Sequence, residues 1–337
     1  MRAGKVRKAE TAPSTRKGVL LQWICSVLLF TVTLAASCTE KSVRTNPPLS
    51  VSSAAVSFVD DDGAAVILDG PRRRVISLYS AHTENLFWIG AGDAVIGGHK
   101  TCTYPPEAAP LAVYDYTGDP EYIIAAEPDL VLIRPFIRRR SGDYIEEIIK
   151  TGIPVVSLYA DAFDNFDGYI RKLAAMTGVD AEAPLALFHE GINNVLAKTR
   201  AVPQDKKQRV FFEVTAENVR TAADGSFPAL AIAAAGGLNV AAGANPVSGG
   251  SSIAAFGIER LIENAARIDV YVAQNGAMNR IRGADEVIAR PAYGVIKAIR
   301  EGRVLVIDEK LISSPTYRFL EGVEEMARFI YPHLDWP

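Results

Sequence analysis

Residues 180–200, DAEAPLALFHEGINNVLAKTR, constrain the fold most, because their apolar positions repeat with the period of a helix. Spacings of three and four place five side chains on one helical face: Leu185, Phe188, Ile192, Val195 and Thr199. Asp180 is placed to cap the first turn. At ~1.5 Å per residue such a helix reaches about 30 Å, the width of a small domain. Because strand and helix signals alternate on either side, we predict two α/β lobes joined by a linking helix at 179–201.

Composition places the chain among globular proteins and limits its partners. The length of 337 residues suggests about two domains, and the apolar content of 49% excludes a disordered chain. Residues 1–37 hold six Lys/Arg and one acidic residue, so removing this segment takes the formal charge from −3 to −8. A folded body this acidic argues against nucleic acid and anionic lipid as its partners.

The N-terminus has the features of an export signal. Basic residues up to Lys17, an apolar run at 19–34 and the small residues Ala35-Ala36-Ser37 indicate a secretory signal peptide over 1–37. Cys38 follows directly, as in a bacterial lipobox, where the signal is cut before the cysteine and the thiol carries lipid. The alternative is an uncleaved membrane anchor, since the apolar run is nearly long enough to span. Both predict an extracytoplasmic body tethered to a membrane through a flexible segment at 38–54.

Residues 55–178 are predicted to form a lobe with a mostly parallel sheet. Strands are expected at 56–59, 65–68, 75–78, 94–97, 130–133 and 154–158, with the turn Asp60-Asp61-Asp62-Gly63 joining the first two as a hairpin. Helices expected at 83–89, 121–126, 144–150 and 163–176 alternate with the later strands, which is typical of parallel crossovers. Ligands of such sheets bind at the carboxyl ends of the strands. The candidates at these ends are Tyr79, His82, Tyr104, Tyr116, Arg134, Phe136 and Arg138.

Residues 202–337 are predicted to form a second α/β lobe. Strands are expected at 209–213, 270–273 and 304–308, and helices at 229–235, 258–264, 295–300 and 316–329. The strand ends again offer candidate ligand contacts, namely Asn218, Arg220, Gln274, Asn275 and Glu309. Both lobes are therefore expected to present these residues to a shared cleft.

No catalytic or nucleotide-binding motif accompanies these lobes. The sequence has no G-x-G-x-x-G between a strand and a helix, no G-x-x-x-x-G-K-[ST] and no G-x-S-x-G. His82-Thr83-Glu84 matches the H-x-E of zinc deaminases, but no P-C-x-x-C follows. Four histidines and the unpaired thiol of Cys102 are a poor ligand set for a bare transition metal. We therefore predict no enzyme and no cofactor, and a ligand that is an already chelated metal or an oxyanion.

Aromatic and basic side chains suit such a ligand. Four rings can stack on or line a large planar molecule, namely Tyr79, Tyr104, Tyr116 and Phe136. Arg134 and Arg138 can pair with carboxylate, phosphate or molybdate-like oxygens, and Arg134 is favoured as a cleft residue because it directly ends a strand. Residues 139–140 are better explained as a solvated loop face. For His82, a ligand contact and a plain surface turn fit the sequence equally well.

Several stretches together resemble one known family. They are VISLYSAHTENLFWIGAGDAVIGG, YPPEA, DPEYIIAAEPDLVLIRP, TGIPVV, GGLNV and SPTYRFLEGVEEMARFIYP. In this order, over about residues 55–332, they are similar to the substrate-binding proteins of ABC importers for iron-siderophores, haem and vitamin B12. The resemblance implies two lobes joined by one helix and a metal chelate held between them. It also implies delivery to a permease dimer with its ATPase.

The resemblance assigns roles to single residues as well. Glu121 and Glu259 match the carboxylates, one on each lobe, that pair with arginines of the permease; the alternative is that both are ordinary acids at helix starts. Tyr116 falls where the vitamin B12-binding member has a Trp, which supports an aromatic wall. At Glu309 and Ile312 this chain departs from that member, which has a Trp and an Arg there, and the departure weakens a strict vitamin B12 assignment.

The sequence therefore predicts a monomeric, membrane-tethered receptor that captures a metal chelate between two lobes and delivers it to an ABC importer. A receptor for molybdate or tungstate is the alternative within this class, and a two-lobed extracytoplasmic enzyme or a sensor is the alternative outside it. A single linking helix implies small lobe closure, with any bend expected at Gly191 or Asn193-Asn194, which are poor helix formers.

Overall fold

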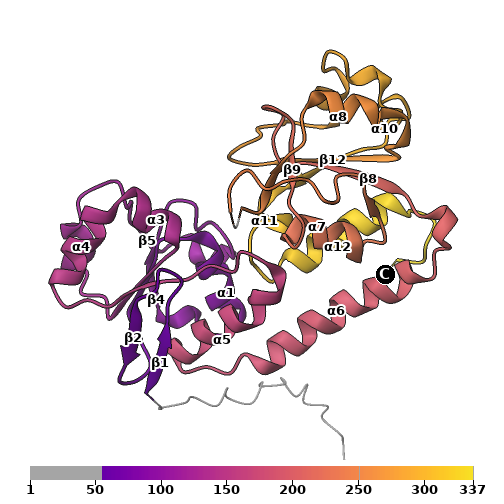
Figure 1. Cartoon of the computed structure of the whole chain (residues 1–337). Helices are drawn as coiled ribbons and strands as arrows, with labels where there is room; N and C mark the ends of the chain where they lie inside the picture. The colour runs from indigo at the N-terminus through magenta and orange to yellow at the C-terminus, as the bar shows by residue number, and fades with distance from the viewer. Residues whose placement is uncertain (1–54, 250, 337) are drawn as a thin grey trace, which may run out of the picture. The chain divides into compact units, whose positions relative to one another are not determined.

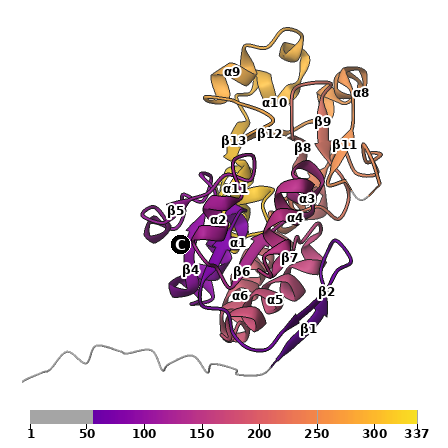
Figure 2. The same ribbon diagram turned by 90° about the vertical axis from the view of Figure 1, so that its left-hand side faces the viewer.

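A computed structural model describes residues 55–249 and 251–336 of the chain (Figure 1 and Figure 2). All of these residues belong to one compact unit, Pro48–Pro337. The predicted signal peptide, the tether at 38–54 and Cys38 lie outside the described residues. Within the described part of the chain, no helix is both long and apolar enough to cross a membrane.

The N-terminal lobe is built on a five-stranded sheet in the order β5-β4-β3-β6-β7, in which all neighbours are parallel. The strands are β3 (Val75–Ser77), β4 (Val95–Gly98), β5 (Ala112–Val113), β6 (Leu130–Ile133) and β7 (Val155–Ser157). The helices of this lobe are α1 (Ser80–Trp88), α2 (Glu121–Ala125), α3 (Pro135–Arg140), α4 (Gly142–Lys150) and α5 (Phe166–Thr177). β6 is buried along its whole length, as its continuous apolar run LVLI predicts for a parallel strand covered on both faces.

A hairpin of β1 (Val56–Val59) and β2 (Ala65–Leu68) precedes this sheet and lies beside α5 (Figure 1 and Figure 2). Its turn is closed by Gly63, whose φ of +84° favours glycine. The turn is attached to the edge strand β7, because the Asp61 amide donates to the Ser157 carbonyl over 2.9 Å. The hairpin is therefore part of the N-terminal lobe.

The linking helix is confirmed as α6 (Glu182–Arg200). Its buried side chains are the five that the spacing placed on one face: Leu185, Phe188, Ile192, Val195 and Thr199. The helix begins two residues later than the predicted stretch, and Asp180 accepts a hydrogen bond from the Glu182 amide over 3.1 Å at this end. Gly178, in the left-handed conformation with φ of +72°, ends α5 just before it.

The C-terminal lobe has a four-stranded parallel sheet in the order β10-β8-β12-β13 and an antiparallel pair, β9 with β11. The strands are β8 (Arg209–Glu213), β9 (Arg220–Ala222), β10 (Leu238–Asn239), β11 (Ile253–Ala255), β12 (Val270–Asn275) and β13 (Val304–Asp308). The helices are α7 (Phe227–Ala234), α8 (Ile258–Glu263), α9 (Ala284–Ile288), α10 (Lys297–Arg300), α11 (Glu309–Ile312) and α12 (Phe319–Ile330). With two sheets of mostly parallel strands, flanking helices and one linking helix, the predicted fold class is confirmed.

One hydrophobic core extends from the N-terminal lobe through α6 into the C-terminal lobe. Its centre is a group of aromatic rings from α5 and the turn before it, α6, α7 and α12, namely Phe163, Phe166, Phe188, Phe227 and Phe319. The ring centre of Phe163 lies 5.8 Å from that of Phe227 and 5.5 Å from that of Phe319. The two lobes are therefore joined by packed side chains as well as by the linking helix.

Several predicted elements are corrected. Residues 139–140, expected on a loop, form the end of α3, because Pro135 stands at the first helical positions, where proline favours a helix start. Gln274-Asn275 lie inside β12 rather than after it, and Arg220 begins β9 rather than ending a loop. The final helix begins at Phe319 instead of Thr316.

Candidate functional site

The strand orders place a topological switch point in each sheet. The order reverses between β3 and β6 in the N-terminal lobe and between β8 and β12 in the C-terminal lobe. Open parallel sheets bind ligands outside the carboxyl ends of the strands at such points. Tyr79 and Arg134 follow β3 and β6 closely, and residues 276–280 follow β12. These chain segments are where a ligand site is expected on physical grounds.

Arg134 is the central residue of the N-terminal part of this site. It leaves β6 as the residue before α3, and its guanidinium carbon lies 4.6 Å from the ring centre of Tyr79, 4.9 Å from that of Phe136 and 6.0 Å from that of Tyr159. No carboxylate of the described residues forms an ion pair with it. Aromatic faces attract a cation without using its N–H groups. The half-buried guanidinium is thus held in place with its hydrogen-bond donors still available.

A cavity of about 670 Å³ opens beside Arg134 between residues of the two lobes. One side is formed by Arg134, Phe136, Arg139 and Tyr159, which we call the arginine wall. The other side is formed by residues 248, 249 and 251–253, a serine-rich segment that leads into β11. A second cavity of about 540 Å³ adjoins it and shares the side of Tyr159 and Asp161. Each of these two volumes lies in the range that is typical of small-molecule binding sites.

The opposite strand ends, in the C-terminal lobe, are fixed by a buried carboxylate. Glu213, at the end of β8, has no exposed surface and accepts hydrogen bonds from Asn279 over 2.8 Å and from Arg290 over 2.7 and 2.9 Å. Tyr271 donates to the same carboxylate, and burial raises the pKa of this tyrosine well above its usual value. Asn279 also donates to the Gln274 carbonyl over 3.0 Å, so the loop after β12 is tied both to β12 and, through Glu213, to β8. This group is a structural anchor, because each of its members is already paired.

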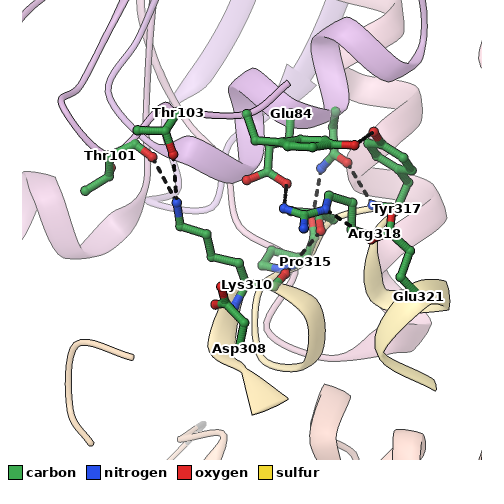
Figure 3. Close-up of polar contacts among 12 residues, drawn as sticks. Glu84, Thr101, Thr103, Asp308, Lys310, Pro315, Tyr317, Arg318 and Glu321 are labelled. Atoms are coloured by element: carbon green, nitrogen blue, oxygen red, sulfur yellow. Dashed lines mark hydrogen bonds and ion pairs between the residues drawn. The ribbon is translucent and has the colours of Figure 1, made fainter. Parts of the chain in front are cut away.

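Direct polar contacts also connect the two lobes (Figure 3). Asn85, in α1, donates to the Pro315 carbonyl over 2.8 Å and accepts from the Tyr317 amide over 3.1 Å. Lys310, at the start of α11, reaches the Thr101 carbonyl and the Thr103 hydroxyl over 3.3 and 3.2 Å (Figure 3). These contacts join α1 and the loop after β4 to α11 and to the segment between α11 and α12, across the lobe boundary.

Glu84 and Arg318 form the charged part of this contact between the lobes. The two side chains point toward each other in Figure 3, and Arg318 Nη1 lies 3.7 Å from Glu84 Oε2. The same guanidinium lies 4.0 Å from the ring centre of Tyr104. Burial raises the pKa of Glu84 to about 7, an effect that the charge of Arg318 opposes. A carboxyl group that changes charge near neutral pH therefore lies between the lobes.

The structure brings some of the predicted N-terminal candidates together. The Arg134 guanidinium lies over the rings of both Tyr79 and Phe136, and Tyr104 lies at the lobe boundary under Arg318. Tyr116 instead stacks on His99 at 5.0 Å between ring centres and is not among the residues that line the two cavities described above. Their contacts with a ligand remain predictions.

Two further candidates have partners within the N-terminal lobe. His82 does not face a cleft: it is fully buried, with Nδ1 2.7 Å from the Tyr169 hydroxyl and Nε2 3.0 Å from the Ile133 carbonyl. Burial lowers its pKa to about 4, so the ring is neutral at physiological pH. Arg138 is already paired, because its Nε lies 3.1 Å from Asp62 Oδ2. Both side chains are therefore engaged within the N-terminal lobe in this conformation, and their contacts with a ligand stay predictions.

Most of the C-terminal candidates form hydrogen bonds within their own lobe. Gln274 is 3% exposed and accepts a hydrogen bond from the Ser313 hydroxyl. Asn275 accepts from the Ile281 amide over 3.1 Å, and Glu309 accepts from the Ala277 amide over 2.9 Å. Asn218 is exposed in a turn with a φ of +55°, and Arg220 is half-buried where β9 pairs with β11. Gln274 is thus buried and already paired in this conformation, and the contacts of all five residues with a ligand stay predictions.

Sequence reasoning missed several residues at the site. Tyr159 follows β7 at its carboxyl end, so the rule that selected Arg134 could also have found it. Arg139 lines the larger cavity although it was assigned to a solvated loop. The serine-rich segment before β11 follows no parallel strand, and Glu84 lies inside a helix, so neither gave a signal.

Two further observations concern metals and outer surfaces. Among the described residues, no group of three or more His, Cys, Asp or Glu side chains lies close enough together to hold a metal ion. Glu121 and Glu259 are exposed in the first turns of α2 and α8, one in each lobe. Their predicted role at a permease is not tested by their positions alone.

These features define a two-lobed α/β binding protein with its candidate ligand site between the lobes. Residues 75–311 match the periplasmic binding protein family, and the chain belongs to this family. Its members are substrate-binding proteins of transporters rather than enzymes, and they work outside the cytoplasm.

Individual relatives support this placement. An uncharacterized ABC transporter substrate-binding lipoprotein of Bacillus subtilis is 25% identical over 282 residues, which are 82% of this chain and 86% of that one. A cobalamin-binding protein of Halobacterium salinarum is 28% identical over 284 residues, 81% of this chain and 73% of that one. The structure of a periplasmic haem-binding protein from Roseiflexus superposes with a TM-score of 0.63 at 22% identity, covering 77% of this chain and 98% of that one. At that identity the likeness shows the fold alone.

Proposed function

We propose that this chain is the substrate-binding lipoprotein of an ABC importer and that it holds a metal chelate with an anionic edge between its lobes. The chelate classes are ferric siderophores, haem and cobamides, bound as cargo. Anchoring through lipid on Cys38 and delivery to a permease dimer with its ATPase complete the proposal. The family, the lipoprotein relative from Bacillus subtilis and the cobalamin-binding relative from Halobacterium support this class.

The observation that carries the ligand class is the state of Arg134. Its guanidinium is fixed by three rings and has no ion-pair partner among the described residues. A guanidinium fork pairs with a carboxylate or phosphate through two parallel hydrogen bonds. The rings around it offer flat apolar surface to a large planar ligand. The combination suits a bulky chelate that carries carboxylate or phosphate at its periphery.

The test is a titration of the purified protein with haemin, cyanocobalamin, ferrichrome and molybdate, followed by calorimetry and by tryptophan fluorescence. We expect one of the three chelates to bind at a single site. Arg134→Gln should weaken that binding about tenfold or more, because a charge-assisted hydrogen bond contributes about 1.5–3 kcal/mol. Arg140→Gln is the matched control, since Arg140 is an exposed arginine at the end of the same helix, α3.

Two results would contradict the proposal. Binding of molybdate alone would identify an oxyanion receptor. Equal affinity of the Arg134→Gln variant and the native protein for the bound chelate would show that the arginine wall is not the ligand site.

A further inference from the structure

The turn of the N-terminal hairpin consists of three successive aspartates, and each is bonded to a different part of the lobe. Asp60 is 5% exposed and organises the turn itself: Oδ1 accepts from the amides of Asp62 and Ala64 over 3.0 and 2.8 Å. Its Oδ2 accepts from the Ser157 amide over 3.1 Å. The turn is thus seated on the end of β7, where the chain leaves the sheet toward the arginine wall.

Asp61 holds the residue that continues into the wall. Its Oδ2 accepts a hydrogen bond of 2.6 Å from the Tyr159 amide. Its Oδ1 lies 3.4 Å from Lys172 Nζ, so both carboxylate oxygens are already engaged although Asp61 borders the smaller cavity. Tyr159 lines both cavities, and its ring lies 6.2 Å from that of Tyr79. The position of this ring therefore depends on a carboxylate from the hairpin.

Asp62 holds the other element of the wall from behind. Its Oδ2 is 3.1 Å from Arg138 Nε, and both side chains are largely shielded, with 17% and 24% of their surface exposed. Arg138 lies on α3 between Phe136 and Arg139, which line the larger cavity. A partly buried ion pair of this kind restrains the helix more than an exposed pair would.

We infer that Asp61 and Asp62 are positioning residues of the ligand site: the hairpin braces the arginine wall through Tyr159 and through α3. This inference rests on the proposed function, in which the arginine wall binds the ligand. Binding sites must hold their contacting groups to within about 0.5 Å, and supporting hydrogen bonds supply that precision. The two aspartates act through the residues that they hold.

Hydrogen exchange of the full-length protein tests the brace without any ligand. Asp61→Ala should speed the exchange of amides in residues 158–162, and Asp62→Ala that of amides in residues 135–140. Asp61→Asn keeps an acceptor for the Tyr159 amide and should restore slow exchange. Asp69→Ala is the matched control, because Asp69 is an aspartate with 94% exposed side chain just after β2. Unchanged exchange in both segments would overturn the inference.

Affinity for haemin, cyanocobalamin or ferrichrome, whichever the native protein binds, tests the consequence for the site. We expect a loss of about tenfold in Asp61→Ala, recovery in Asp61→Asn and no change in Asp69→Ala. Faster exchange with native affinity would overturn the positioning role, since a merely structural contact predicts that result. A native protein that binds none of the probes would instead refute the proposed function, while the exchange comparison still decides whether the brace exists.

Discussion

At the residue scale, the charged groups between the lobes are of two kinds. Arg134 is stabilised by aromatic faces, each contributing about 0.5–2 kcal/mol, and these leave its donors unused. Glu84 is only 1% exposed, and the 3.7 Å to Arg318 is longer than a charge-assisted hydrogen bond. Glu84 Oε2 also has no hydrogen-bond partner among the described residues. The ion pair therefore offsets only part of the cost of burying this carboxylate.

Glu84→Gln should change how stability depends on pH. Burial raises the pKa of Glu84 from 4.5 to about 7, with Arg318 and Lys310 opposing the shift and Asp308 adding to it. A raised carboxyl pKa means that the folded state binds the proton more tightly than the unfolded state. Its stabilising effect is complete below pH 4.5 and is lost as the pH rises through 7. The variant should escape this loss, which amounts to about 3 kcal/mol at most.

Urea unfolding at pH 5 and pH 8 measures the difference. The free energy of unfolding of the native protein should fall more between these two values than that of Glu84→Gln. Glu147→Gln removes an exposed carboxylate from α4 and should leave the native pH dependence in place. The same pH dependence in Glu84→Gln and the native protein would contradict the shifted pKa.

At the element scale, segments with a clear apolar pattern were predictable, and segments too short to carry one were not. α6 and β13 (Val304–Asp308) carry patterns that packing then satisfies, so their buried faces could be read directly. β5, β10 and β11 have two or three residues, too few for any period, and they exist because neighbouring strands pair with them. Strand pairing of this kind is a property of the tertiary fold.

Part of the candidate site was also predictable from the sequence. The rule about strand ends found Tyr79 and Arg134, because parallel strands bring their carboxyl ends to one edge. The rule could not show that His82 and Arg138 are already paired, because their partners are distant in sequence. These partners are Tyr169 for the histidine and Asp62 for the arginine. Which polar side chain is already paired cannot be known until these contacts are seen.

The contact between α6 and α12 gives a test at this scale. Gly191, expected as a bend, is instead a point of close approach, because a Cβ there would overlap the side chain of Leu320. Gly191→Ala should destabilise the protein by about 1–2 kcal/mol through this overlap, despite the better helix propensity of alanine. In a Leu320→Ala background the overlap is relieved, and the same change should stabilise by up to about 1 kcal/mol.

Urea unfolding of the native protein, both single variants and the double variant completes this cycle. The sign of the effect of Gly191→Ala should reverse between the two backgrounds. A stabilising effect in both would show that Leu320 moves aside at no cost and that close packing is not the reason for the glycine.

At the scale of the whole molecule, the lobes share one core. The rings of Phe163, Phe227 and Phe319 would have to separate for the lobes to rotate far. The contacts of Asn85 and Lys310 across the lobe boundary add polar restraints. These features support the prediction of small lobe closure, and small-angle scattering with and without ligand is the measurement for it. A rigid pair of lobes also keeps Glu121 and Glu259 at a constant separation.

That constant separation underlies the prediction for delivery. Glu121 and Glu259 are exposed on short helices of different lobes. Because one exposed ion pair contributes only about 0.2–1 kcal/mol, either single change to alanine should lower uptake only a few-fold. Glu121→Ala with Glu259→Ala should remove most of it, since the partner must engage both lobes at once. Ligand affinity should stay at the native value, because neither residue lines the described cavities.

Uptake of radiolabelled chelate by cells whose own copy of the gene is deleted, together with calorimetry on the purified variants, separates docking from binding. Glu147→Ala with Glu301→Ala is the matched control, one exposed acid from each lobe outside α2 and α8. If the double variant at 121 and 259 loses affinity as well as uptake, the two residues belong to the ligand site. If it keeps both, they are ordinary acids at helix starts, placed there by the favourable helix dipole.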